Sequence, residues 1–332
     1  MRLRSDPMQN SAIHPRIALV LGATGSLGAA AARALQAHGW RVRALHRRLD
    51  RARALPAVPS GIDWLNGDAM RADDVRAAAN GVTAIIHAVN PPHYRRWREL
   101  AIPMLANTIE AAATSGARLI FPGNVYNFGP DAGAVVDETS PQNPLTRKGC
   151  IRVEMEAMLQ AASENGRLRA MVIRAGDFFG GTAANSWFAK IIVPAKPGAP
   201  IRYPGSFGAG HAWAYVPDLA ETMAKLIEME RSLPAWEVVH FGGHWLERGV
   251  EMAEAVQRVV GGGSVIRPFS WLPFRLLSPF SPFLREVLEM RYLWHEPLRL
   301  ASDRLHGLIG EEPHTPLDEA VGTAVAALGR TR

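Results

Sequence analysis

A glycine-rich turn near the N-terminus is the part of this sequence best suited to chemistry. Its residues are Gly22, Ala23, Thr24, Gly25, Ser26, Leu27 and Gly28, which place three glycines in a G-x-x-G-x-x-G pattern. An apolar segment that predicts a buried strand, 17–21, precedes the turn, and an alanine-rich segment that predicts a helix, 29–38, follows it. Glycines let the backbone approach a phosphate, and the start of a helix offers free N–H groups. The seven residues therefore predict a binding site for the pyrophosphate of a dinucleotide.

The second predicted strand, 41–46, indicates which dinucleotide binds. A site for NAD usually has an acidic residue here, which bonds the ribose 2′-hydroxyl. The first carboxylate after the glycine turn is Asp50, and Arg47 and Arg48 follow the strand directly. Guanidinium groups bind phosphate well. We therefore predict NADP rather than NAD, with Arg47 at the 2′-phosphate; the alternative is a solvated basic loop.

Strands and helices alternate along the first half of the chain. The predicted strands are 62–66, 83–87, 118–121 and 168–174, and the predicted helices are 72–79, 94–115 and 147–164. We expect Pro103 to kink or divide the second of these helices. The alternation predicts an α/β fold with a doubly wound parallel sheet, in which residues 15–175 bind the dinucleotide. Ligands bind at the carboxyl ends of such strands, where this chain has Asp68, Ala69, Ala88 and Val89.

The pattern changes after residue 175. Segment 176–211 is rich in Gly and Pro, and the end of the chain holds an aromatic and proline-rich stretch, 268–294. We expect strands near 212–216 and 236–241 to rejoin the sheet, and 176–211 and 242–332 to form a smaller C-terminal cap that binds substrate. The aromatic stretch suits a membrane surface, an apolar substrate or, as we favour, the core of that cap. Four further aromatic residues suggest an apolar or aromatic substrate: Trp187, Phe188, Tyr203 and Trp213.

Composition narrows the remaining classes of function. The net charge is +6, but no long Lys/Arg tract and no basic–aromatic pattern predict nucleic-acid binding. The single cysteine, Cys150, has no evident base, is expected to pack, and is typical of a reducing, cytoplasmic location. Residues 1–14 predict a disordered leader, and no apolar run is long enough for stable insertion into a membrane. His87 and His93 lack the Cys or Glu partners of a metal site.

Several motifs together resemble the extended short-chain dehydrogenase/reductase family, which includes sugar-nucleotide epimerases and dehydratases. Besides the glycine turn, the matching segments are 67–68, 87–89, 125–126, 174–180 and 214–220, so the resemblance covers roughly 15–330. It implies a Rossmann-like fold and a nicotinamide cofactor, with the segment at Asp68 near the adenine. It also implies a small carbonyl or hydroxyl compound as substrate, and a homodimer through the helices 94–115 and 147–164. Apolar residues on these two helices are Ile102, Leu105, Ile109, Val153, Met155 and Met158.

The usual catalytic residues of that family are missing. Its members act through Ser or Thr, Tyr and Lys, the last two spaced Tyr-x-x-x-Lys, and none of the five tyrosines here has a Lys four residues later. One alignment of the helix puts Lys148 in the Tyr place and Arg152 in the Lys place; a rival register puts Thr146 and Cys150 there. We prefer the first, which keeps a cation at the Lys place. Pro122 stands in the Ser place.

Four residues are therefore candidates for catalysis. Lys148 is the first, as a general base with a lowered pKa or as a ligand of the cofactor ribose. Tyr126 is a candidate proton donor, Asn124 could orient a carbonyl, and Asp177 could bind substrate or a proton. Their ordinary alternatives are a solvated lysine, a packed phenol, a turn amide and a loop-capping carboxylate. The sequence thus predicts an atypical reductase, epimerase or dehydratase, or alternatively a redox-silent NADP-sensing protein on the same fold.

Overall fold

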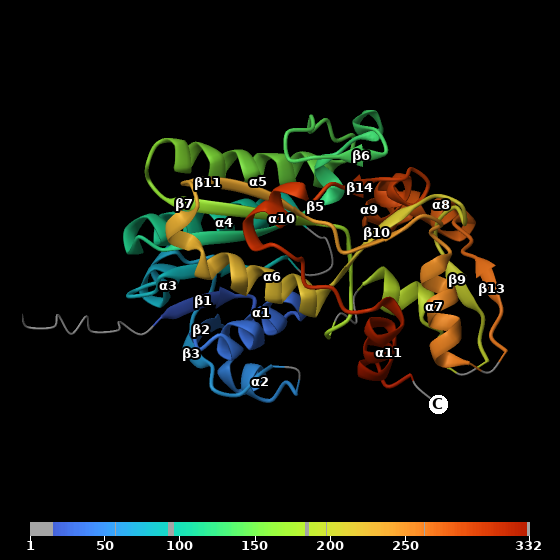
Figure 1. Cartoon of the computed structure of the whole chain (residues 1–332), viewed down its shortest axis with the longest axis horizontal. Coiled ribbons are helices and arrows are strands. Elements are labelled where there is room, and N and C mark those ends of the chain that lie inside the picture. The colour runs from blue at the N-terminus through green and yellow to red at the C-terminus, as the bar shows by residue number, and fades with distance from the viewer. Residues whose placement is uncertain are drawn as a thin grey trace, which may run out of the picture.

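A seven-stranded parallel sheet forms the centre of the protein, as Figure 1 shows. This computed structural model describes residues 16–330 except 57, 92–95, 183–185, 197 and 262, so the expected leader, 1–14, lies outside it. The strand order is β11-β7-β5-β4-β1-β2-β3. The strands are β1 (Ile17–Leu21), β2 (Arg41–His46), β3 (Asp63–Asn66), β4 (Ala84–His87), β5 (Arg118–Asn124), β7 (Arg169–Ala175) and β11 (Trp236–Phe241). The order reverses direction between β1 and β4, which is where a doubly wound sheet binds its ligand.

Helices cover both faces of this sheet. On one face lie α1 (Ser26–Ala37), α6 (Val216–Glu228) and α10 (Asp303–Ile309), and on the other lie α3 (Ala72–Ala78), α4 (Trp97–Ser115) and α5 (Arg147–Glu164). A short helix, α2 (Leu49–Arg53), follows β2. The central strands are apolar on both sides because both faces are covered. The expected doubly wound, Rossmann-like fold is confirmed.

The helix α4 runs unbroken through Pro103, so Pro103 does not divide it, whereas a kink there stays a prediction. Proline removes one backbone N–H, but the buried face around it still packs against the sheet. The apolar residues expected at a dimer interface fall into two groups. Leu105, Ile109 and Met155 are buried in this chain's own core, whereas Ile102, Val153 and Met158 are half-buried. The homodimer stays a prediction.

The later part of the chain forms two smaller sheets. One contains β8 (Asp177–Phe179), β10 (His211–Tyr215) and β12 (His244–Leu246), and the other pairs β9 (Ile201–Tyr203) with β13 (Ile266–Pro268). Of the two strands that we expected to rejoin the large sheet, β11 lies at its edge beside β7, whereas β10 lies in the three-stranded sheet. The sequence of β10 is apolar and buried in either position, so composition alone cannot assign it to one sheet.

Helices and aromatic side chains complete this second region. The helices are α7 (Glu251–Val260), α8 (Leu272–Leu277), α9 (Pro282–Glu289) and α11 (Leu317–Ala327), with short turns at η4 (Phe188–Ile192), η6 (Ser278–Phe280) and η7 (Met290–Trp294). Phe188, Tyr203 and Trp213 are at most 1% exposed and pack together in one core. These side chains therefore do not line a surface for an aromatic substrate.

The segment 122–145, between the end of β5 and the start of α5, is partly ordered by distant contacts. β5 extends through Asn124, then come the turns η2 (Val125–Asn127) and η3 (Pro130–Ala132), and β6 (Val135–Val136) pairs with β14 (Arg299–Leu300). Over the part of the chain that the structure describes, every helix is too short or too polar to cross a bilayer.

Candidate functional site

The glycine turn lies at the carboxyl end of β1, and each of its glycines meets a different constraint. Gly22 has a φ of 88°, and a Cβ there would lie 2.5 Å from the carbonyl oxygen of Ala88. A Cβ on Gly28 would lie 2.2 Å from the oxygen of Gly22. Gly25 is different, because the tightest contact of an added Cβ would be 3.2 Å. Two glycines therefore permit the turn itself, while Gly25 leaves space on the side where a ligand would approach.

This turn suits a pyrophosphate. Gly25 is the N-cap of α1, without any side chain that caps the helix, and the first turn of α1 contains no acidic residue. The N–H groups at a helix start then lack their usual intrahelical acceptors and attract an anion. The contact with Gly22 also brings Ala88 and Val89, from the end of β4, against the turn. Ser26 donates to the carbonyl oxygen of Gly180 at 3.3 Å, which ties the turn to the chain after β8.

The residues predicted for the adenine end also lie together. Arg47 follows β2 and Asp68 follows β3, and Arg47 Nη1 lies 3.8 Å from Asp68 Oδ2. The Arg47 side chain is 74% exposed. Asp68 accepts a hydrogen bond from the backbone N–H of Met70, and the carbonyl of Ala69 accepts one from Asn107. The site thus presents one cation and one carboxylate side by side.

Lys148 is buried in the first turn of α5 rather than solvated. Its side chain is 2% exposed, and Nζ lies 2.7 Å from both Oε2 and the main-chain oxygen of Glu286. Glu286 belongs to α9, and the neighbouring Glu289 accepts a hydrogen bond from the backbone N–H of Arg147. Burial lowers the pKa of the Lys148 ammonium, and the hydrogen bond and charge of Glu286 oppose this shift. The α9 helix therefore covers the residue that our preferred alignment puts in the family's Tyr place.

Arg152 faces inward one turn further along α5. It donates to the carbonyl oxygen of Pro122 at 3.2 Å and to Asn90 Oδ1 at 3.4 Å, and its guanidinium lies over the ring of Trp97. It thus joins the carboxyl ends of β4 and β5. The residues of the rival register point elsewhere. Thr146 is the N-cap of α5 and accepts from the backbone N–H of Gly149, whereas Cys150, which we expected to pack, is exposed.

His87, at the end of β4, is held neutral beside this cation. Burial, reinforced by the charge of Arg152, lowers the pKa of His87 to about 3. Thr108 donates its hydroxyl proton to the carbonyl of Met104, so its oxygen accepts from His87 Nδ1 at 2.9 Å. This pattern fixes the tautomer with the proton on Nδ1. Among the described residues no group of His, Cys, Asp and Glu could hold a metal ion, and His93 lies outside them.

Asn124 and Tyr126 lie next to the start of α5. The side chain of Asn124 accepts from the backbone N–H of Tyr126 at 3.0 Å, so it stabilises the turn η2. Tyr126 is half-buried and packs against a small apolar cluster. A Cβ on Gly149 would lie 2.3 Å from the carbonyl oxygen of Tyr126, which shows how closely α5 approaches this turn. The structure therefore brings Asn124, Tyr126 and Lys148 to one edge of the sheet.

Asp177 is part of a strand rather than a loop cap. The strand β8 leaves the sheet after Ala175, whose register partner is Asn124, and ends near Ser26 at the glycine turn. It thus runs along the edge where the cofactor is expected. Asp177 Oδ2 lies 2.9 Å from Nε2 of His211, and both side chains are largely buried. The ring of Trp294 stacks on His211 with centroids 4.3 Å apart.

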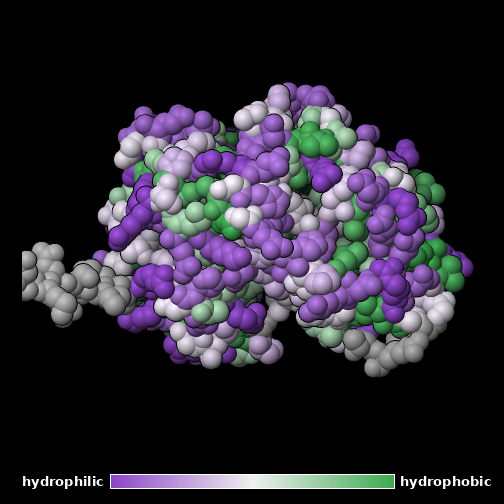
Figure 2. All heavy atoms as spheres, viewed as in Figure 1, coloured by the Kyte–Doolittle hydropathy of each residue, from purple (hydrophilic) through white to green (hydrophobic). Residues whose placement is uncertain are grey.

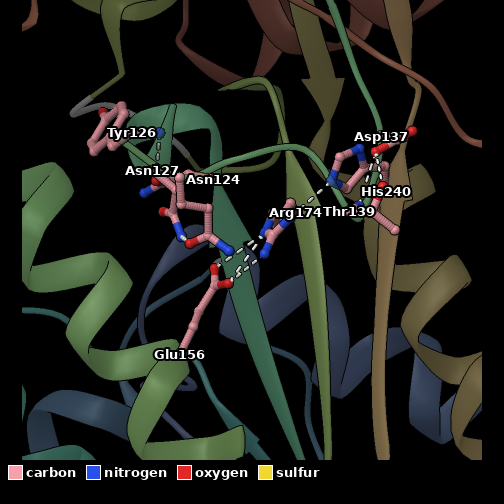
Figure 3. A network of polar contacts seen from close by, with 9 residues as sticks. Asn124, Tyr126, Asn127, Asp137, Thr139, Glu156, Arg174 and His240 are labelled. Carbon is pink, nitrogen blue, oxygen red and sulfur yellow. Dashed lines mark hydrogen bonds and ion pairs between the residues drawn. The ribbon is translucent and has the colours of Figure 1, made fainter. Parts of the chain in front are cut away.

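A buried ion pair, Arg174–Glu156, lies next to this end of the sheet. Figure 3 shows Arg174 lying between Glu156 and His240, with Nη2 2.8 Å from Glu156 Oε2 and Nη1 3.2 Å from His240 Nε2. Both charged side chains are at most 4% exposed. Burial and the charge of Arg174 lower the pKa of His240 to about 3. The pair joins α5 to β7, next to the strand that carries Asn124.

Sequence reasoning missed three residues of this region. Asn90 was passed over within the segment after β4, although its place at a strand end was a usable signal. His211 and Glu286 carried no local signal, because their partners lie 34 and 138 residues away in the sequence. They were recognisable only from their positions in space.

The comparisons with known proteins agree with this architecture. The family model described as the NAD dependent epimerase/dehydratase family matches residues 18–242. UDP-glucose 4-epimerase from Brucella ovis, in complex with NAD, has a TM-score of 0.75 at 15% identity, over 95% of this chain and 98% of that one. DesIV, a dTDP-glucose 4,6-dehydratase from Streptomyces venezuelae with NAD and TYD bound, has a TM-score of 0.74 at 16% identity, over 94% of this chain and 96% of that one. UDP-glucose 4-epimerase from Thermotoga maritima, with UDP-glucose, has a TM-score of 0.73 at 14% identity, over 94% of this chain and 98% of that one.

No curated protein sequence matches the chain. The structural likenesses, at this level of identity, show the fold. The family model covers more than half of the 332 residues, and it includes the glycine turn, the start of α5 and Asp177. The chain therefore belongs to the NAD dependent epimerase/dehydratase family.

Proposed function

We propose that the protein binds NADP and acts as a reductase, epimerase or dehydratase on a small carbonyl or hydroxyl compound. In this proposal Lys148 takes the part that the family gives to Tyr. The observation that carries it is the buried ammonium of Lys148, in the first turn of a helix whose next residue, Gly149, lies against the backbone of Tyr126. The cofactor would supply hydride transfer at its nicotinamide.

The residues present fit the cofactor at two places. The uncapped start of α1 and the space beside Gly25 suit the pyrophosphate. Arg47 suits a 2′-phosphate, because its guanidinium is mostly exposed and its 3.8 Å contact with Asp68 is too long for a strong hydrogen bond. The related structures from Brucella ovis and Streptomyces venezuelae contain NAD. We nevertheless propose NADP, on the charge of Arg47.

The proton chemistry would belong to Lys148. Reduction of a carbonyl requires a proton at its oxygen, and oxidation of a hydroxyl requires a base to remove one. The lowered pKa of Lys148 brings the ammonium closer to a value at which both directions work. Glu286 would hold the ammonium in place and would have to release it when a substrate binds. Asp177 and His211 would face the substrate from the other side of the edge.

A second candidate is a redox-silent protein that binds NADP. The observation that favours it is the 2% exposure of Lys148, whose ammonium already has two acceptors on Glu286. The two candidates differ in one measurement, the consumption of NADPH with a panel of aldehydes, ketones and nucleotide sugars. Turnover that depends on Lys148 supports the enzyme, and tight binding without turnover supports the second candidate.

The choice of cofactor has its own test. A charge-assisted hydrogen bond contributes about 1.5–3 kcal/mol, so NADPH should bind at least about tenfold more tightly than NADH. Arg47→Ala should remove most of this difference in titration calorimetry. Arg53→Ala, at the end of α2, is the matched control and should leave the difference in place. Equal affinities of the native protein for NADPH and NADH would show that the prediction is wrong.

A further inference from the structure

The segment Leu272–Glu289, here called the α8–α9 hairpin, has an exposed apolar face. Of the large apolar side chains that are exposed in the described residues, five lie within this segment: Leu272, Leu276, Leu277, Phe280 and Phe283. Phe280 is 86% exposed and Leu276 is 65% exposed. In Figure 2, hydrophobic residues gather at the right-hand margin of the molecule, where Figure 1 places α8. Scattered apolar residues are ordinary on a surface, but a group of this size indicates a contact with something else.

The other side of the hairpin is firmly attached to the protein. Trp271 is buried, and Phe274, Val287 and Leu288 pack against the aromatic core of the second region. Glu286 and Glu289 reach the first turn of α5. The apolar face is therefore held outward by a fixed inner face, and it does not arise from a segment that lacks packing partners.

The charges of the hairpin are divided between its two sides. Glu286 and Glu289 turn inward to Lys148 and to the backbone of Arg147, while Arg275 and Arg285 are exposed. The outer face is thus both apolar and basic, on a chain whose net charge is +6. Apolar side chains flanked by arginines are typical of segments that lie in the interface of an anionic bilayer.

We propose that the α8–α9 hairpin docks the protein on an anionic lipid surface. Phe280, Leu276 and Phe283 would enter the boundary between headgroups and acyl chains, and Arg275 and Arg285 would contact lipid phosphates. The six residues of α8 and eight of α9 are far too few to span a bilayer, so the contact is peripheral. A second copy of this chain fits less well, because the same arginines of two copies would be brought together.

The test is flotation of the full-length protein with vesicles. We expect binding to phosphatidylcholine vesicles that contain phosphatidylserine, and little binding to phosphatidylcholine alone. The double variant Leu276→Ser/Phe280→Ser should lower the partition coefficient at least about tenfold. Arg275→Gln and Arg285→Gln should each lower it about fivefold, the effect of one cationic side chain near an anionic surface.

Leu55→Ser, an exposed leucine beyond α2, is the matched control and should leave binding unchanged. Because all substituted side chains are exposed, circular dichroism and the melting temperature should stay those of the native protein. Two results would overturn the proposal. One is equal partitioning of the double variant and the native protein; the other is a native dimer in light scattering that the double variant loses.

Discussion

The contact between Lys148 and Glu286 can be perturbed at one charge. Glu286→Gln retains the main-chain oxygen that accepts from Lys148 Nζ at 2.7 Å and replaces only the carboxylate that lies at the same distance. Burial lowers the pKa of Lys148, and the carboxylate of Glu286 is the main influence that raises it. Removal of that negative charge favours the neutral amine, so the pKa of Lys148 should fall further.

The size of this fall follows from the two kinds of hydrogen bond. A bond to a charged acceptor contributes about 1.5–3 kcal/mol and a neutral one about 0.5–1.5 kcal/mol, a difference of roughly 1–1.5 kcal/mol. Glu286 is 23% exposed, so solvent screening places the effect at the lower end. At about 1.36 kcal/mol per pH unit, the pKa of Lys148 should fall by about one unit.

The pKa can be measured without a substrate. The chain has only four lysines, so the carbon next to each amine is resolvable by NMR in lysine-labelled protein, and Lys148→Met identifies the signal. Glu296→Gln is the control, because Glu296 is an exposed glutamate that lies beyond the end of α9. If Glu286→Gln leaves the titration of Lys148 where it was, or moves it to higher pH, the ion pair does not control this amine. Where a substrate is turned over, the limb of the pH–rate profile that reports Lys148 should move in the same direction.

Two further predictions concern the glycine turn and the buried histidines. Gly25→Val should abolish NADPH binding while the protein keeps a native circular dichroism spectrum. Gly28→Ala, whose Cβ would lie 2.2 Å from the oxygen of Gly22, should also lower the melting temperature. A folded Gly25→Val variant that binds NADPH normally would contradict the assignment of the glycine turn. His87 and His240 have pKa values near 3 in the folded protein against about 6.5 when unfolded, so unfolding takes up protons between these values. The free energy of unfolding, measured in urea, should therefore decrease as the pH falls below about 6.5, by up to about 1.4 kcal/mol per pH unit for each histidine. In His87→Asn, unfolding should take up one proton fewer, so this pH dependence should be weaker.

The sequence was sufficient wherever a local rule sets the structure. The apolar strand 17–21, the glycine turn and the alanine-rich helix identify one another because they are adjacent in the chain. The same rules allowed Pro103 to divide its helix, but α4 continues through it and packs against the sheet on both sides of that residue. They also assigned β10 to the large sheet, which was wrong, since a short apolar strand can be buried in either sheet.

The chemistry at the site depends on contacts that no local rule describes. The sequence left open whether Lys148 is a general base with a lowered pKa, a ligand of the cofactor ribose or a solvated lysine. Its burial comes from α9, and the pair Asp177–His211 joins two strands of the second region. Both depend on how that region folds back on the sheet, and neither involves a motif. Sequence reasoning therefore described the glycine turn better than it described the surroundings of Lys148 and Asp177.

Stability does not explain a buried ammonium at position 148. Desolvation of a charge costs more than a surface ion pair returns, and an apolar side chain of similar size is often equally stable or better. Glu286 is 23% exposed, so it can regain water when its partner is removed. Lys148→Met should therefore keep or raise the melting temperature of the protein. If Lys148 handles the proton, the same variant should lose about 10²-fold or more in turnover. A loss of stability together with full activity would instead assign Lys148 to the structure of the protein, as an anchor for α9.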